Sequence, residues 1–124
     1  MIIVELYKLR ILSNNLNFNV AHFCRVSIGN TMFVNHLFRC CAAAGVKIYE
    51  AENAKSLDEL KNYLIKSCEH CKKAIEWIDI ISNIGIYSLT LLNNIKDECT
   101  VIINEISNID YGNITLFSIE NETV

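Results

Sequence analysis

Residues 56–82 carry the pattern that most constrains the fold of this 124-residue chain. Apolar or small side chains recur there at steps of three and four, which places them in one stripe along a helix, as in the seam of a coiled coil. Charged side chains fill most other positions, so the segment predicts a long amphipathic helix with one face in a core. The stripe comprises Leu57, Leu60, Leu64, Cys68, Cys71, Ile75, Ile78 and Ser82, widened by Trp77 and Ile81.

Both ends of this helix have sequence signals. Ser56 followed by Glu59 predicts a capping box, in which the Ser56 hydroxyl accepts a hydrogen bond from the Glu59 amide and the Glu59 carboxylate accepts one from the N-cap amide. Gly85 predicts the other end, because glycine readily adopts the left-handed conformation that closes a helix.

Two further stripes predict two further helices. One covers 88–106, and the short turn before it makes an antiparallel pairing the expectation. The other lies upstream of Ser56, where Gly45 costs about 1 kcal/mol in mid-helix and therefore predicts a close approach of a neighbouring helix. The 88–106 stripe is Leu92, Ile95, Cys99, Ile102 and Ile106, and the upstream stripe is Val34, Leu37, Phe38, Cys41, Gly45, Ile48 and Tyr49.

The two ends of the chain have weaker patterns. Residues 2–12 have helical spacing, the asparagine-rich segment 13–19 breaks it, and 18–28 fits either a helix or a strand. Residues 110–124 fit a frayed or strand-like tail. With no proline to interrupt helices, the chain is expected to form one all-α domain over 1–124, an antiparallel up-and-down four-helix bundle.

No apolar run approaches the roughly 20 residues that span a bilayer, and the first residues lack the layout of a secretion signal. We therefore expect a cytoplasmic protein that does not enter a membrane. In that reducing compartment the six cysteines are expected to be thiols, used mainly as small buried apolar groups.

Charge is unevenly distributed along the chain. Residues 1–47 hold five Lys or Arg and one acid, a net +4, whereas 48–124 hold six Lys and thirteen acids, a net −7. Binding to nucleic acid requires several cations close together, and no dense basic cluster occurs. An accessory nucleic-acid binder is therefore an alternative interpretation, and it would use Arg10, Arg25, Arg39 and Lys47.

Cys68, His70 and Cys71 form the clearest candidate for chemistry, because Cys-x-x-Cys can hold zinc or cycle as a disulfide. A structural zinc site needs four ligands, and the sequence offers no second pair. Redox pairs usually lie at a helix start, whereas this pair falls three turns inside the 56–82 helix. Core packing is the favoured interpretation, and a metal-binding or redox bundle is the alternative. No catalytic motif occurs, so we expect no enzyme activity and no cofactor.

The segment 37–56 contains an arginine, a run of small residues, a Glu-Ala pair, a polar link and a serine before the next helix. The positions of this motif are Arg39, Gly45, Glu50, Asn53 and Ser56. The motif resembles a known family, the four-helix-bundle proteins encoded in intervening sequences of bacterial 23S ribosomal RNA, which includes the accessory protein of diversity-generating retroelements. The likeness covers roughly residues 33–107 and extends to the acidic-aromatic run 76–81.

The resemblance implies a left-handed antiparallel bundle and a ring-like homo-oligomer, commonly a pentamer. Relatives that partner a reverse transcriptase contact nucleic acid through basic surfaces, whereas the best-matching part of this chain is acidic. The first helix departs from the family pattern, since it would start late and be followed by a long link over 14–31. The leading hypothesis is a non-enzymatic oligomeric scaffold or adaptor that holds a protein partner, such as a reverse transcriptase, and RNA through it.

Self-association also has support in the residues themselves. The chain has more apolar side chains than one seam per helix can bury, and large exposed apolar patches are uncommon on monomers. A second copy is expected to cover them, as a ring if contacts are head-to-tail or as a dimer if one patch meets itself. The surplus side chains are Ile80, Ile84, Ile86, Tyr87, Val101, Ile103, Ile109 and Leu116.

Overall fold

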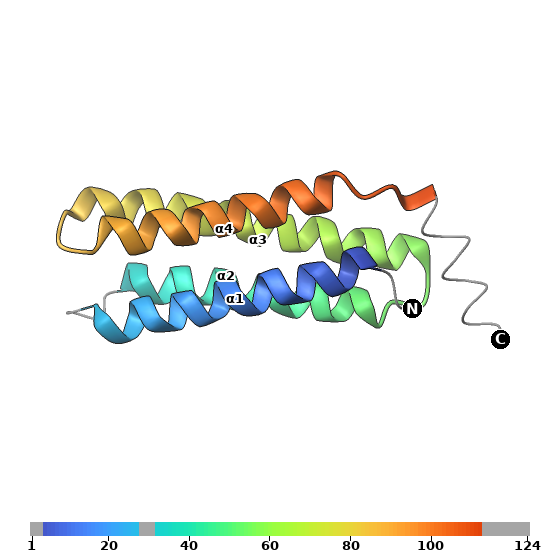
Figure 1. Ribbon diagram of the computed structural model, residues 1–124, viewed down its shortest axis with the longest axis horizontal. Coiled ribbons are helices and arrows are strands. Elements are labelled where there is room, and N and C mark those ends of the chain that lie inside the picture. Colours follow the sequence, from blue (N-terminus) through green and yellow to red (C-terminus); the bar gives the residue numbers. More distant parts are fainter. Residues whose placement is uncertain (1–3, 28–31, 113–124) are drawn as a thin grey trace.

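The computed structural model describes residues 4–27 and 32–112, which form an elongated bundle of four helices (Figure 1). The helices run alternately up and down and are α1 (Val4–Val26), α2 (Met32–Glu52), α3 (Leu57–Ile84) and α4 (Leu89–Ser107). α1 and α3 each pack against both α2 and α4. The seam between α1 and α4 and the seam between α2 and α3 are therefore opposite edges of the bundle, and the predicted all-α four-helix fold is confirmed. No helix in the described ranges could cross a membrane.

In each helix the buried residues recur at alternating steps of three and four along the sequence. This heptad spacing keeps the buried seam on one side of a helix and is the geometry of long antiparallel bundles. In α4 the buried set is Leu92, Ile95, Cys99, Ile102 and Ile106, as predicted. In the other helices the sets are Leu6, Leu9, Ser13, Leu16, Val20 and Phe23; Val34, Leu37, Cys41, Ala44, Ile48 and Ala51; and Leu60, Leu64, Ser67, Cys71, Ala74, Ile78 and Ile81.

The predicted seams of α3 and α2 were partly wrong. In α3 the half-buried residues Leu57, Cys68, Ile75 and Ser82 flank the core, whereas Ser67 and Ala74 lie in it, as does Ile81, which was predicted at the edge of the stripe. In α2, Phe38 and Tyr49 are exposed, and Ala44 and Ala51 are buried. The reason is common to both helices: where they approach closely, small side chains such as Ala44, Ser67 and Ala74 fill core positions, so the most apolar residue is not always the most buried one.

The interpretation of residues 13–28 also requires correction. The structure shows one continuous helix from Val4 to Val26, with neither a break at the asparagines nor a strand. Residues 28–31 lie outside the described residues, as do residues 113–124 of the predicted tail. The asparagines fit the helix because their side chains bond across to neighbours: Asn17 Nδ2 donates to the carbonyl of Cys41 at 3.1 Å, and Asn19 Nδ2 donates to Glu98 Oε1.

Local signals place the ends of α3 as predicted, with one difference. The Ser56 hydroxyl accepts from the Glu59 amide at 3.1 Å, and Gly85 closes the helix at φ 82°. The Glu59 carboxylate, however, accepts from the amide of Lys55 at 3.3 Å, one residue before the expected N-cap amide. The start of α4 has a similar cap, in which Ser88 accepts from the amide of Leu91 at 3.2 Å.

The centre of the bundle is small and polar. Ser67 is fully buried and donates to the carbonyl of Ala44 at 2.9 Å. Close by, a Cβ on Gly45 would lie 2.8 Å from Ser13 Oγ and 3.1 Å from Asn17 Nδ2, so α2 and α1 also approach closely there. The buried thiol of Cys99 on α4 lies beside those of Cys41 and Cys71, so these positions of α2, α3 and α4 lie at the same height along the bundle.

Candidate interaction surfaces

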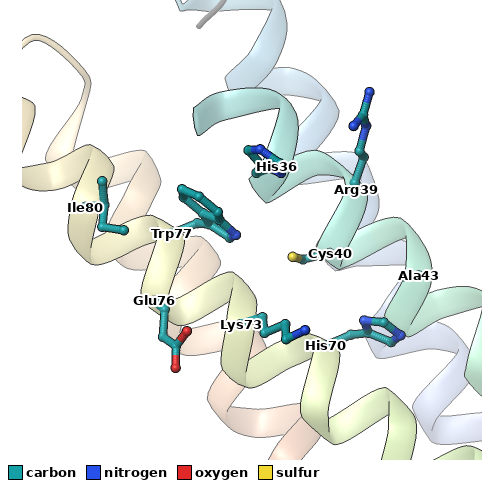
Figure 2. A pocket seen from close by; sticks show the side chains of 9 residues that line it. All are labelled: His36, Arg39, Cys40, Ala43, His70, Lys73, Glu76, Trp77 and Ile80. Carbon is teal, nitrogen blue, oxygen red and sulfur yellow. The ribbon is translucent and has the colours of Figure 1, made fainter. Parts of the chain in front are cut away.

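A groove of about 520 Å³ runs between α2 and α3. Figure 2 shows Trp77 and Lys73 reaching from α3 toward α2, and the Cys40 thiol pointing into the same space, whereas the Glu76 carboxylate points away. We call it the basic groove, defined by its nine lining residues His36, Arg39, Cys40, Ala43, His70, Lys73, Glu76, Trp77 and Ile80.

Aromatic contacts fix the upper part of the basic groove. The His36 ring stacks on the Trp77 indole with centroids 4.5 Å apart and planes at 6°, and Phe33 lies against the same indole at 5.8 Å. Offset and stacked rings of this kind hold one another in place. Trp77 is thus a rigid apolar wall, and Ile80 continues it as an exposed apolar side chain.

A second groove, which carries acidic instead of basic side chains, lies at the opposite edge of the bundle. It lies between α1 and α4, has a volume of about 330 Å³, and is lined by two carboxylates, two asparagine amides and three apolar side chains, with no cation among these lining residues. Asp97 has no ion-pair partner among residues 4–27 and 32–112, and Phe18 is 69% exposed. We call it the acidic groove, defined by Leu12, Asn15, Phe18, Asn19, Asp97, Glu98 and Val101.

Glu98 is held in an unusual position in the acidic groove. Its Oε1 accepts from Asn19, and its Oε2 is buried with no hydrogen-bond partner among the described residues. Burial raises the pKa of the Glu98 carboxyl, and the Asn19 hydrogen bond opposes that shift. A buried acceptor without a donor is costly, so the groove holds negative charge that the fold itself leaves unneutralised.

Several large apolar side chains lie on the outside of the helices. On α1, Val4, Ile11 and Phe18 are exposed and are spaced by seven residues, which places them in one line along its outer face. Of the surplus residues predicted from the sequence, Ile80, Ile84, Ile86 and Val101 are exposed, Tyr87 is buried against Phe23, Ile103 and Ile109 pack half-buried on the core, and Leu116 lies outside the described residues.

The residues of the family-like motif serve different local purposes. Arg39 is exposed on the rim of the basic groove, and Gly45 faces Ser13 across the α1–α2 contact. Glu50 pairs with Lys47 at 3.0 Å. Asn53 follows α2 directly and donates to the carbonyl of Tyr49 at 3.0 Å, and Ser56 caps α3.

The four cations of the nucleic-acid alternative do not form one surface. Arg10 is paired with Glu52 at 3.0 Å beside the α1–α2 contact, and Lys47 is paired with Glu50 on the α3 side of α2. Arg25 lies at the far end of α1, and Arg39 lies in mid-α2. Within residues 4–27 and 32–112 these charges are dispersed, which does not favour simultaneous contact with several phosphates.

The candidate metal or redox residues point to three different places. Cys71 is a buried free thiol beside Cys99, His70 lines the basic groove, and Cys68 is half-buried near Tyr111. Burial raises the pKa of Cys68 to about 11, and the hydrogen bond with Cys99 together with burial raises the pKa of Cys71. Thiols with raised pKa are poor nucleophiles and poor metal ligands. Across the part of the chain that the structure describes, no three His, Cys, Asp or Glu side chains are arranged to hold a metal ion.

The sequence did not reveal the two grooves. The contact between Asn19 and Glu98 joins residues far apart in the chain, as does the stack of His36 on Trp77. The spacing of Val4, Ile11 and Phe18 was the one signal available from the sequence, since a repeat of seven on a helix marks a single face.

Comparison with known proteins places the fold. No protein-family model matches the chain, and no curated protein matches it in sequence. Among solved structures, a protein of unknown function from the S23 ribosomal protein family of Bacteroides thetaiotaomicron matches with a TM-score of 0.77 and 15% identity, over 83% of this chain and 95% of that one. The chain therefore has the four-helix fold of an S23 ribosomal protein family member, the fold that the resemblance over residues 33–107 implied.

Proposed function

We propose that this chain is a cytoplasmic, non-enzymatic helical-bundle scaffold that assembles with copies of itself and, as an assembly, holds a protein partner. The observation that carries the proposal is the line of exposed apolar residues Val4, Ile11 and Phe18 on the outer face of α1. The core of the bundle is already complete without them, because each helix fills its own buried seam. Apolar residues in a row on a soluble surface are typical of a contact with another protein.

The interior supports a structural role. The buried hydroxyl of Ser67 and the half-buried amide of Asn17 donate hydrogen bonds to backbone carbonyls of α2, and the buried thiol of Cys99 lies beside those of Cys41 and Cys71. These groups are engaged in packing helices together. The six unpaired thiols suit a reducing compartment.

The experiment is sedimentation of the purified chain beside two variants, Phe18→Asp and Asn62→Asp. Both positions are exposed, and Asn62 lies on α3, away from the line on α1 and outside both grooves, so neither change should unfold the bundle, and circular dichroism checks this. We expect the wild type and Asn62→Asp to sediment as oligomers at micromolar concentration and Phe18→Asp to dissociate at least tenfold more readily. A wild-type chain that sediments at 14.1 kDa at every concentration contradicts the proposal.

A further inference from the structure

We infer that the two grooves are the two halves of one contact: the acidic groove of one copy docks on the basic groove of the next. This inference rests on the proposed function and specifies how copies meet. It follows from the charge, the apolar shape and the position of the two grooves.

Charge is complementary across the two edges. Arg39 and Lys73 on the basic groove have no ion-pair partner within residues 4–27 and 32–112, and neither has Asp97 on the acidic groove. Glu98 adds a second acid, and its hydrogen bond is to the neutral Asn19. Complementary charges favour contact between unlike edges and oppose contact between like edges, where Asp97 would face Asp97 or Lys73 would face Lys73.

Apolar shape is complementary as well. Phe18 stands out from the acidic edge with 69% of its surface exposed, and Val101 lies beside it at 43%. The basic groove offers Trp77 and Ile80 on its α3 side and the small residues Cys40 and Ala43 on its α2 side. An aromatic ring that enters a groove lined by another aromatic ring is a frequent anchor of protein contacts.

The positions of the two grooves allow the same contact to repeat from one copy to the next. The grooves lie on opposite edges of the bundle, because the α1–α4 seam is opposite the α2–α3 seam. They lie at the same height along the bundle, since Cys40 of the basic groove and Glu98 of the acidic groove are next in sequence to Cys41 and Cys99, whose buried thiols lie beside each other in the core. Each copy thus keeps one edge free after it docks through the other, and contacts of this head-to-tail kind form a ring when the rotation from copy to copy closes.

A charge exchange tests the pairing. Lys73→Glu alone and Asp97→Lys alone each place like charges across every contact and should lower the mass seen by light scattering toward 14.1 kDa. The double variant Lys73→Glu with Asp97→Lys restores opposite charges at every contact and should recover the wild-type mass. Lys72→Glu is the matched control, because Lys72 is an exposed neighbour that does not line the basic groove. All four variants should keep the wild-type helical content by circular dichroism.

The outcomes separate this inference from the proposed function. If the wild type assembles but the double variant stays dissociated, or if Lys72→Glu is as disruptive as Lys73→Glu, the pairing of the two grooves is wrong while self-association stands. If the single variants assemble as well as the wild type, the pairing is wrong in the same way. If the wild type is itself a 14.1 kDa monomer, the proposed function fails together with the pairing.

Discussion

The hydroxyl of Ser67 donates to the carbonyl oxygen of Ala44 across the α2–α3 interface at 2.9 Å, and Ser67 is fully buried. That carbonyl belongs to the backbone of α2, so the bond requires the two helices to approach closely. Small residues on both sides permit this approach, and the polar bond favours one alignment of α3 along α2 over alternatives shifted by a turn.

The Ser67 bond leads to a first prediction. Ser67→Ala should lower the free energy of unfolding by about 0.5–1.5 kcal/mol, the usual net value of one hydrogen bond, and chemical denaturation measures it. Ser67→Leu should cost more, because the added volume must separate α2 from α3. A Ser67→Leu variant as stable as the wild type would show that the helices do not meet closely at this point.

Gly45 gives a second prediction. Any side chain there meets Ser13 and Asn17, since a Cβ would lie 2.8 Å from Ser13 Oγ. Gly45→Leu should therefore destabilise the bundle by about 1–3 kcal/mol, measured as a shift of the denaturation midpoint. The matched comparison is Gly45→Ala with and without Ser13→Ala: the second change removes the shorter of the two close contacts, leaving that with Asn17 Nδ2 at 3.1 Å, and should recover part of the stability. A Gly45→Leu variant that melts at or above the wild-type temperature contradicts close packing of α1 on α2 at this position.

A third prediction concerns the phase of α3. Leu64 is fully buried and Ile65, next to it, is 52% exposed. Leu64→Ala should cost about 2–5 kcal/mol through lost burial and the cavity left behind. Ile65→Ala, measured under conditions where the chain is dissociated, should change stability by about 0.5 kcal/mol or less. Equal effects of the two substitutions on the unfolding midpoint would mean that α3 is rotated about its axis, so that Ile65 also faces the core.

The buried carboxyl of Glu98 predicts that the stability of the folded chain depends on pH. Its pKa is raised in the folded chain, mainly by burial, so the folded state binds the Glu98 proton more tightly than the unfolded state does. The contribution of Glu98 to the free energy of unfolding therefore falls as pH rises from about 4.5, the ordinary glutamate pKa, to the raised pKa of Glu98 in the folded chain. At higher pH this contribution is constant. Glu98→Gln removes the charge, so, measured under conditions where the chain is dissociated, it should raise the melting temperature at neutral pH and lose that advantage below about pH 4.5.

The control for Glu98 is Glu69→Gln, which changes an exposed glutamate on α3. Its melting temperature should follow that of the wild type at each pH. If Glu98→Gln and Glu69→Gln gave the same pH profile, burial would not be the cause of the Glu98 behaviour.

Particular residues show how far the sequence predicted this fold. The α4 seam from Leu92 to Ile106 was predicted in full, because every core position there is apolar apart from one cysteine. In α1 the core includes Ser13, and the helix continues through asparagines whose partners, Cys41 and Glu98, lie on other helices. Helix propensity and periodicity describe a segment in isolation, so side chains satisfied by distant partners were misinterpreted as a break.

The candidate surfaces were less predictable than the core. The close approach at Gly45 was predicted from the cost of glycine in mid-helix, which is a local property of the sequence. The basic groove depends on α2 and α3 lying in register, which brings His36 over Trp77. The acidic groove depends on α1 and α4, the first and last helices, meeting along their length. Neither register follows from the pattern of a single segment, because each is set by packing in the assembled bundle.

The central claim is that copies of this chain cover one another's outer apolar surface. The most direct measurement is the absolute molar mass of the purified chain, obtained by light scattering at micromolar concentration. We expect a closed ring with a mass several times 14.1 kDa, and about five times if the ring has the size that the family resemblance implies. A mass of about twice 14.1 kDa would contradict the head-to-tail ring while leaving self-association intact, and a mass of 14.1 kDa would contradict the central claim itself.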